Sequence, residues 1–244
     1  MKEFQFKEED KEGLNTLEII SKADKFNRWM FDTISPYCKG RILEIGSGIG
    51  NISQFFIGVN ASITLSDIRE NYCTQLKEDF SDSTSLDEVL MIDLADPDFE
   101  NRYQKYKETF DTVFALNVLE HIEDDLGALR NCHYLLKDGG TLLILVPAYQ
   151  SLYCRFDREL GHFRRYTKKT LRKVFELNNF HIKDSRYFNV VGIFGWIFSG
   201  MILREKTIPE GQMDLYNKLV PVFKIIDKTF LQSFGLSVIM VGNK

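Results

Sequence analysis

The sequence is poor in cysteine and shows no grouping of the residues that typically bind metal ions. Its four cysteines are widely spread, with no C-x-x-C pair and no histidine at ligand spacing. A structural zinc site is therefore not expected, and no metal site is predicted. Scattered thiols of this kind are typical of reduced, mostly buried cysteines in the cytosol, so we expect a cytoplasmic protein. The four are Cys38, Cys73, Cys132 and Cys154.

The chain also lacks an excess of positive charge. Its 31 lysines and arginines stand against 35 acidic residues, which gives a net charge of -4 and a pI of about 5.7. Because a nucleic-acid backbone attracts basic surfaces, nucleic acid is not expected as the main partner. Residues 1–12 are charged and have no apolar signal core, so export is not expected. Residues 1–15 are predicted to form a loose or lightly docked tail.

What the sequence does contain is the composition of an ordinary globular chain. With 44% hydrophobic and 27% charged residues over 244 positions, it can bury a sizeable core. This length fits one α/β domain with room for additions. Apolar residues between positions 16 and 34 fall close to helical spacing, which predicts a leading helix that Ser35 and Pro36 bring to an end.

A glycine-rich turn follows the first predicted strand. The apolar residues 42–45 run into Gly46, Gly48 and Gly50, and a helical pattern resumes after Asn51. Such a turn lets backbone N–H groups approach a ligand closely. A phosphate-binding loop would need Gly-Lys-Ser/Thr at its end, and no lysine is present here. The dinucleotide fingerprint is G-x-G-x-x-G, whereas this turn is G-x-G-x-G.

An acidic residue, Glu44, stands two positions before the first glycine. The resulting pattern, E-x-G-x-G-x-G at a strand end, resembles the first motif of the class I S-adenosylmethionine-dependent methyltransferases. In that family the turn packs against the methionine part of the cofactor, and no pyrophosphate is present. The resemblance implies that the cofactor contacts Glu44, Gly46, Ser47, Gly48 and Gly50.

Acidic residues also end the next two predicted strands. Asp67 closes strand 61–67 at about 20 residues beyond the turn, the spacing at which a carboxylate reaches ribose hydroxyls. Both S-adenosylmethionine and NAD have such a ribose, and a helix N-cap is the structural alternative. In the family, the residue that ends the third strand (here 88–94) binds the adenine amino group. The cofactor is therefore also expected at Asp67, Ile68, Asp93 and Leu94.

The segment after the fourth predicted strand (110–116) reads N-V-L-E-H-I. It closely resembles the family's fourth motif, and a dehydrogenase does not need it. The resemblance implies that Asn117, largely through its backbone, and Val118 lie beside the methionine end of the cofactor. Glu120 and His121 follow at the mouth of the site. His121 is either a proton acceptor or a histidine at a helix start that shapes the pocket.

These elements alternate without an internal repeat, and their ligand-binding features all fall at strand ends, where open α/β sheets bind ligands. We therefore predict an α/β, Rossmann-like, doubly wound seven-stranded sheet, mostly parallel with an antiparallel last strand, and a helical insertion before that strand. The whole chain is predicted to be one methyltransferase domain. Its parts are a tail and capping helix (1–36), a cofactor-binding core (41–147), and an acceptor loop, lid insertion and closing strands (148–244).

The loop after the fifth predicted strand (141–147) is rich in aromatic, acidic and basic side chains. Its pattern D-x-x-x-G-H-x-R-R-Y-T, from Asp157 to Thr167, resembles one found in a bacterial branch of the family. His162 is the first choice for a general base and His121 the second, because both titrate in the useful range. His162 bonded to backbone is the alternative. The residues predicted to bind substrate are Tyr149, Tyr153, Arg164, Arg165 and Tyr166.

The two adjacent arginines allow two interpretations. Guanidinium groups match carboxylate or phosphate in a fork, so Arg164 and Arg165 are predicted to clamp an anionic group of the substrate. The alternative is an internal ion pair with Asp157, Glu159 or Asp184. Thr167 is predicted to cap a helix over residues 168–177.

An insertion separates the sixth predicted strand (180–191) from the last one (236–241). Residues 190–203 are strongly apolar but too short and glycine-broken for a membrane span, and residues 216–230 have amphipathic spacing. A helix pair packed over the site as a lid is predicted. A surface for a lipid acceptor, with peripheral membrane contact through 190–203, is the alternative.

Together these patterns predict a methyltransferase that uses S-adenosylmethionine to methylate O or N of a small-molecule acceptor, with lipids and sugars both open. A cofactor-binding protein without catalysis, either regulatory or membrane-associated, is the alternative. A nucleotide-dependent oxidoreductase ranks third because its glycine spacing differs. The sequence predicts no oligomeric state.

Overall fold

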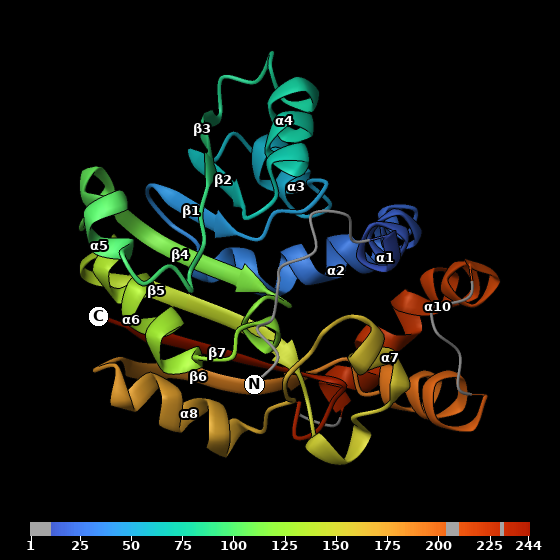
Figure 1. Cartoon of the computed structure of the whole chain (residues 1–244). Helices are drawn as coiled ribbons and strands as arrows, with labels where there is room; N and C mark the ends of the chain where they lie inside the picture. The colour runs from blue at the N-terminus through green and yellow to red at the C-terminus, as the bar shows by residue number, and fades with distance from the viewer. Residues whose placement is uncertain (1–10, 204–209, 230–231) are drawn as a thin grey trace.

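The computed structural model describes residues 11–203, 210–229 and 232–244. Its centre is a seven-stranded sheet with strand order β3-β2-β1-β4-β5-β7-β6 (Figure 1). All neighbouring strands pair in parallel except β7, which is antiparallel to both β5 and β6. The predicted fold class is therefore confirmed. The strands are β1 (Ile42–Ile45), β2 (Ile63–Asp67), β3 (Leu86–Met91), β4 (Phe110–Leu116), β5 (Leu136–Pro147), β6 (His181–Phe188) and β7 (Ser237–Asn243).

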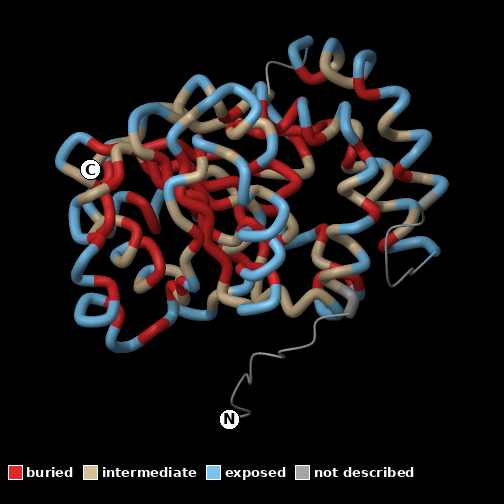
Figure 2. The backbone as a smooth tube through the Cα atoms, turned by 90° about the horizontal axis from the view of Figure 1, so that it is seen from above, coloured by how far each residue is buried: buried red, intermediate tan, exposed pale blue. Residues whose placement is uncertain are grey.

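Helices cover both faces of this sheet, and each face has its own apolar core. One core packs the sheet against α5, α6 and α8. The other packs it against α2, α3, α4 and α10. Figure 2 shows the buried residues running through the middle of the molecule. The helices are α1 (Lys11–Ser21), α2 (Asp24–Ile34), α3 (Ser53–Gly58), α4 (Glu70–Asp79), α5 (Phe99–Arg102), α6 (Asp125–Leu135), α7 (Arg155–Glu159), α8 (Lys168–Leu177), α9 (Gly192–Trp196) and α10 (Glu210–Thr229).

Single turns of 3-10 helix and one π-helical segment connect these elements. The 3-10 turn after β4 carries Glu120 and His121, so it matters most for the site. The short segments are η1 (Ser35–Tyr37), η2 (Gln104–Tyr106), η3 (Leu119–His121), η4 (Gln150–Leu152) and the π-helix η5 (Ile197–Ile202).

The N-terminal segment differs from its prediction in two ways. Residues 11–15, predicted as tail, belong to α1, while residues 1–10 lie outside the described part. The single leading helix is instead two helices that break at residues 22–23. At the break Ala23 is buried, and the side chain of Asn27 donates to the Ile20 carbonyl at 2.8 Å. The Ile20 carbonyl at the break therefore accepts two hydrogen bonds, from the Ala23 N–H at 2.9 Å and from the polar Asn27, which interrupts the apolar pattern.

The third strand ends earlier than predicted, at Met91 rather than Leu94. The hydroxyl of Tyr103 accepts from the Asp93 backbone N–H at 3.2 Å and donates to the Met91 carbonyl at 3.1 Å. A side chain thus takes the backbone bonds that a longer strand would have made. Asp93 and Leu94 consequently lie on a loop beyond the strand.

The predicted helix pair before the last strand is present, formed by α9 with η5 and by α10. Both oxygens of the buried Asp227 carboxylate accept backbone N–H groups, from Asn189 at 2.9 Å and from Val190 at 2.6 Å. α10 is thereby tied to the start of the insertion. Over the described residues, no helix combines the length and apolar character needed to cross a membrane.

Candidate functional site

The glycine turn after β1 needs glycine at each of its three positions. Gly46, Gly48 and Gly50 have φ angles of +73°, +54° and +82°, in the left-handed region that L side chains rarely adopt. A Cβ at Gly46 would collide with the side chain of Val118, which follows β4. At Gly48 it would meet Leu17 of α1 at 3.0 Å. The first and fourth motifs are therefore in direct contact, and α1 lies over the turn.

The carboxylate of Glu44 lies beneath this turn and is only 4% exposed. It accepts a hydrogen bond from the Ser53 hydroxyl at 2.5 Å. Burial raises the pKa of Glu44 to about 7, although the hydrogen bonds from Ser53 and Ser47 act in the opposite direction. Ser47 is also buried and bonds to Ser66 of β2. Ser47 thus holds the turn to β2, and the Glu44 side chain holds β1 to the start of α3.

Asp67, at the end of β2, is bonded directly to the glycine turn. Its Oδ2 accepts the Gly48 N–H at 3.0 Å, and its Oδ1 accepts the Arg69 N–H at 3.0 Å. The residue at the N-cap position of α4 is Arg69, so Asp67 is not that helix's N-cap. Burial raises the pKa of Asp67. Ile68 is half-buried beside it. Each carboxylate oxygen keeps a second lone pair for a ligand hydroxyl.

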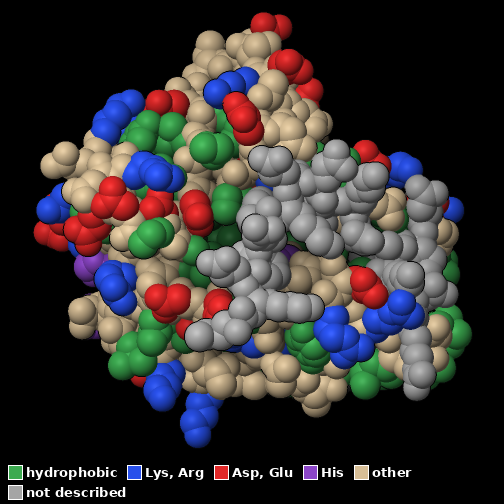
Figure 3. Space-filling model, viewed as in Figure 1, with side chains coloured by type: hydrophobic (Ala, Val, Ile, Leu, Met, Phe, Trp, Pro, Cys, Tyr) green, Lys and Arg blue, Asp and Glu red, His purple; other side chains and the backbone are tan. Residues whose placement is uncertain are grey.

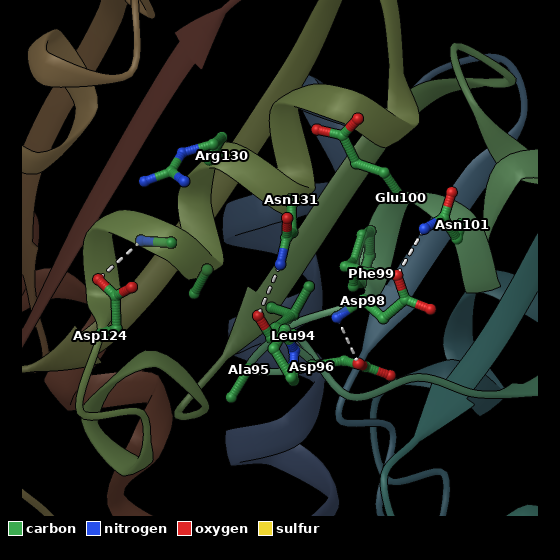
Figure 4. Close-up of a pocket in the computed structure, with 13 residues that line it drawn as sticks. Leu94, Ala95, Asp96, Asp98, Phe99, Glu100, Asn101, Asp124, Arg130 and Asn131 are labelled. Carbon is green, nitrogen blue, oxygen red and sulfur yellow. Dashed lines mark hydrogen bonds between the residues drawn. The ribbon is translucent and has the colours of Figure 1, made fainter.

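Asp93 and Leu94 lie on the loop after β3. Asp93 is half-buried and accepts the Ala95 N–H at 2.8 Å, and the Leu94 side chain is buried. A cavity of about 460 Å³ lies between this loop and α6, where the amide of Asn131 donates to the Leu94 carbonyl (Figure 4). Neither Asp93 nor the glycine turn lines this cavity. The cavity is therefore next to the end of β3, on the side of the loop that faces α6.

Asn117 ends β4 in a strained backbone conformation. Its φ is +54°, its side chain is exposed, and its N–H donates to the Leu145 carbonyl at 2.8 Å. This left-handed step turns the chain away from the strand. Val118 then packs on Gly46, and η3 begins with Leu119. Glu120 and His121 therefore follow directly after Val118, the residue that contacts the glycine turn.

A polar cluster lies where η3 meets the loop after β5. Glu120 is completely buried, and neither of its carboxylate oxygens has a hydrogen-bond partner among the described residues. Nε2 of His162 lies 4.0 Å from Oε1 of Glu120. The ring of His121 meets that of His162 edge-on, with 4.6 Å between ring centroids. The Phe163 N–H donates to the Glu120 carbonyl at 2.8 Å, which joins the two segments.

The environment of the cluster shifts two pKa values strongly. Burial raises the pKa of Glu120 to about 7, against the opposing influence of His162. Desolvation lowers the pKa of His121 to about 3, and the electrostatic influence of His162 and Arg69 acts in the same direction. The His121 side chain has solvent-accessible surface, yet atoms of the surrounding protein crowd its ring. Because perturbed groups gather at functional sites, this cluster is the best candidate for chemistry.

Asp157 organises the loop next to the cluster, a role that the sequence pattern did not reveal. Its Oδ1 faces Nδ1 of His162 at 2.9 Å and accepts from Nε of Arg165 at 2.8 Å. Its Oδ2 accepts the Cys154 N–H at 2.9 Å. Asp157 is fully buried, and the Arg165 guanidinium packs over the ring of Trp196 at 4.2 Å. Of the partners considered for Arg165, the internal ion pair with Asp157 is the one observed.

The other residues predicted to bind substrate also have partners within the protein. Arg164 pairs with Asp125 at 2.9 Å and donates to the Glu123 carbonyl at 2.6 Å. The Tyr166 hydroxyl donates to Asp125 at 2.9 Å, and that of Tyr153 donates to the His162 carbonyl at 2.7 Å. The remaining aromatic residue of the set, Tyr149, stacks on Tyr187. Their contacts with an acceptor stay predictions.

All four cysteines are free thiols, three of them buried and Cys38 half-buried. On the face shown in Figure 3, acidic and basic side chains are interspersed over the described surface. Both observations agree with the sequence, which has no disulfide pattern and a balanced charge.

Comparisons with known proteins identify a methyltransferase domain in part of the chain. A family model described as a methyltransferase domain matches residues 43–142. The ubiquinone biosynthesis O-methyltransferase of Xanthomonas campestris pv. campestris (strain B100) is 29% identical over 104 residues, which cover 43% of this chain and 41% of the relative. The reducing polyketide synthase BOA6 of Botryotinia fuckeliana is 33% identical over 113 residues, or 45% and 4% of the two chains. The chain thus spans less than half the length of these curated relatives.

Solved structures share the fold. A methyltransferase from Archaeoglobus fulgidus superposes with a TM-score of 0.57 at 18% identity, covering 89% of this chain and 94% of the other. The phosphoethanolamine N-methyltransferase 2 of Haemonchus contortus, in complex with S-adenosyl-L-methionine, gives a TM-score of 0.58 at 16% identity, covering 89% and 52%. Together with the sheet order, these structures confirm the predicted Rossmann-like methyltransferase fold. Residues 43–142 thus match a methyltransferase domain, within a chain that has the fold of the S-adenosylmethionine-dependent methyltransferases.

Proposed function

We propose that this protein transfers a methyl group from S-adenosylmethionine to oxygen or nitrogen of a small-molecule acceptor. The observation that carries the proposal is the contact between Val118 and Gly46. Through it, the turn that would hold the cofactor's methionine end lies next to the segment that carries Glu120 and His121. A donor site and a reactive polar cluster are thereby held at one edge of the sheet, as a displacement between two aligned groups requires.

The residues at this edge fit the cofactor. The glycine turn has no Cβ at Gly46, Gly48 and Gly50, the buried Asp67 carboxylate is bonded to it, and Asn117 is an exposed residue in the left-handed conformation. We assign the ribose hydroxyls to Asp67 and the adenine amino group to Asp93. The other residues assigned to the cofactor are Glu44, Gly46, Ser47, Gly48, Gly50, Ile68, Leu94, Asn117 and Val118.

S-adenosylmethionine supplies a methyl group on a sulfonium: as a lone pair of the acceptor forms the new bond to the methyl carbon, the carbon–sulfur bond breaks and its electrons stay on sulfur. A hydroxyl acceptor must also lose its proton. His162 is placed to accept it, because its Nδ1 is bonded to Asp157 and its Nε2 points into the polar cluster. His121 lies across the same cluster and shapes it.

A histidine that could act as a base favours oxygen over nitrogen as the acceptor atom, because a hydroxyl must lose its proton. The Xanthomonas relative is also named for O-methylation. The surface near the loop favours an apolar acceptor. Phe194, Phe198 and Ile202 are 69%, 56% and 65% exposed and recur every four residues along α9 and η5. An apolar stripe of this kind suits a lipid-like molecule or a membrane surface. We assign residues 190–203 to such peripheral contact.

Two measurements test the proposed function. Calorimetry should detect binding of S-adenosylmethionine and none of NAD. A screen for S-adenosylhomocysteine release should then identify an acceptor among lipids, phenols, sugars and amines. Tight NAD binding without a response to the sulfonium would refute the donor assignment. Cofactor binding without turnover on any acceptor, in a screen that covers all four classes, would favour a non-catalytic binding protein.

A further inference from the structure

We propose that Glu120, His121 and His162 bind a divalent transition-metal cation, which holds the acceptor hydroxyl for methyl transfer. The sequence predicted no metal site, since Glu120 and His121 stand far from His162 along the chain. The structure brings one ligand atom of each residue within 4.8 Å of the others. This inference rests on the proposed methyltransferase function and specifies how its acceptor is held.

The first argument is the unsatisfied carboxylate of Glu120. It is fully buried, and its two oxygens have no hydrogen-bond partner in the described chain. A buried carboxylate without partners is costly, so such groups are normally paired, bonded to metal or neutralised by a proton. The separation of 4.0 Å between its Oε1 and Nε2 of His162 is too long for a hydrogen bond. A cation about 2.0–2.2 Å from each atom could bridge the pair once the two atoms approach to about 3.4 Å, the separation in a tetrahedral site.

The second argument is the way His162 is held. Its Nδ1 lies 2.9 Å from Oδ1 of Asp157, which fixes the proton on Nδ1 and leaves the Nε2 lone pair facing Glu120. Histidines that bind metal ions typically donate their other N–H to a carboxylate in this way. Asp157 is itself fixed by Arg165 and by the Cys154 N–H. The ligand is therefore oriented before any cation arrives.

His121 supplies the third ligand from the residue next to Glu120. Three bonds of about 2.1 Å at tetrahedral angles place the ligand atoms about 3.4 Å apart, so a cluster whose ligand atoms lie within 4.8 Å of one another must contract by up to about 1.4 Å when the cation binds. Of the three ligands, His121 is the exposed one, so its side chain is expected to make most of this shift. The charge of Arg69 bears on His121 and opposes a cation, but the Glu120 carboxylate offsets it. Arg165 is already paired with Asp157.

The donor set indicates the kind of cation. Two imidazole nitrogens and one carboxylate oxygen suit zinc, cobalt, iron or manganese better than magnesium or calcium. Three protein ligands leave positions open for water and for the acceptor oxygen. A cation there lowers the pKa of the acceptor hydroxyl, whose proton then leaves to water. His162 serves as a ligand in that state, and as the base only when the cation is absent.

The test uses the full chain, treated with a chelator and then titrated with Co²⁺ while the visible absorption spectrum is recorded. One site with a nitrogen and oxygen ligand spectrum is expected, and Zn²⁺ should displace the cobalt. Glu120→Gln should abolish binding, and it should fold because it removes an unpaired buried charge. His121→Asn, at a partly exposed position, is the second variant. Asp157→Asn should weaken binding by about 10–100-fold.

Matched controls are Glu123→Gln and His181→Asn, two exposed residues outside the cluster, which should leave cobalt binding unchanged. Absence of binding by the unaltered protein would overturn the inference. So would binding that survives both Glu120→Gln and His121→Asn, or a sulfur-to-cobalt band that reports a cysteine ligand. If S-adenosylmethionine binds and is turned over in metal-free protein that takes up no cation, only the cation inference fails. If S-adenosylmethionine itself does not bind, the proposed function fails.

Discussion

Oδ1 of Asp157 lies 2.9 Å from Nδ1 of His162 and 2.8 Å from Nε of Arg165, so one buried carboxylate oxygen holds both side chains. This arrangement connects the stability of the loop after β5 to its chemistry. Arg165 anchors the loop against Trp196 and the Ala148 carbonyl, while His162 faces the polar cluster.

Asp157→Asn is expected to destabilise the protein by about 3–5 kcal/mol, because the buried Arg165 guanidinium loses its partner. Chemical denaturation would measure this loss. Glu159→Gln is the matched control in the same helix. It breaks the exposed Arg155–Glu159 pair, and it should cost less than about 1 kcal/mol. Equal losses for the two variants would contradict the central place of Asp157.

Asp67→Asn is expected to weaken S-adenosylmethionine binding by about 1.5–3 kcal/mol, roughly 10–100-fold, because the ribose hydroxyls lose a charged acceptor. Calorimetry measures the change directly. Asp79→Asn, at the exposed end of α4, should leave the affinity as it is. An unchanged affinity for Asp67→Asn would remove this residue from the cofactor site.

Gly46→Ala is expected to abolish cofactor binding and to lower stability. The new Cβ collides with Val118, and φ at this position is +73°. The double variant Gly46→Ala with Val118→Ala relieves the collision but not the backbone strain, so only part of the stability should return. Gly58→Ala is the control, since a Cβ there meets nothing within 4 Å. Full recovery in the double variant would show that φ is unimportant.

The buried Glu44 should make stability depend on pH. Burial raises its pKa in the folded protein to about 7 from 4.5, so the folded state holds this proton more tightly than the unfolded state. The stability of the native protein relative to Glu44→Gln should therefore be highest below about pH 4.5, fall as pH rises and level off above about pH 7. The total change is roughly 3 kcal/mol. Denaturation at several pH values measures it, with the exposed Glu70→Gln as a control. A constant difference between native protein and Glu44→Gln would argue against the raised pKa.

The exposed stripe on α9 and η5 should bind vesicles. Cosedimentation with liposomes is expected for the native protein and should fall when Phe194 and Phe198 are both changed to Ser, because the apolar area that enters the interface is lost. Leu177→Ser is the control, as Leu177 is also exposed (59%) but lies at the end of α8. The membrane proposal fails if the double variant and the control sediment alike.

Much of the fold followed from local patterns. β4 (Phe110–Leu116) and α8 (Lys168–Leu177) have the predicted boundaries, since apolar periodicity and the Thr167 cap are encoded in neighbouring residues. Strand β3 and the leading helix differ from prediction. After β3 the Tyr103 hydroxyl accepts the Asp93 N–H, which the predicted longer strand would have bonded to its neighbour. In the leading helix the Asn27 amide donates to the Ile20 carbonyl at the break.

The sequence by itself determined the order of strands and helices, the glycine turn and the acidic strand ends, because these depend on residue type and spacing within short segments. Only the tertiary structure decided which acid Arg165 pairs with, that Asp157 orients His162, and that the buried Glu120 carboxylate has no hydrogen-bond partner among the described residues. These are contacts between segments that meet when η3 packs against the loop after β5. The partner of each of these side chains depends on distances and burial in the folded protein. Residue spacing along the chain does not contain this information.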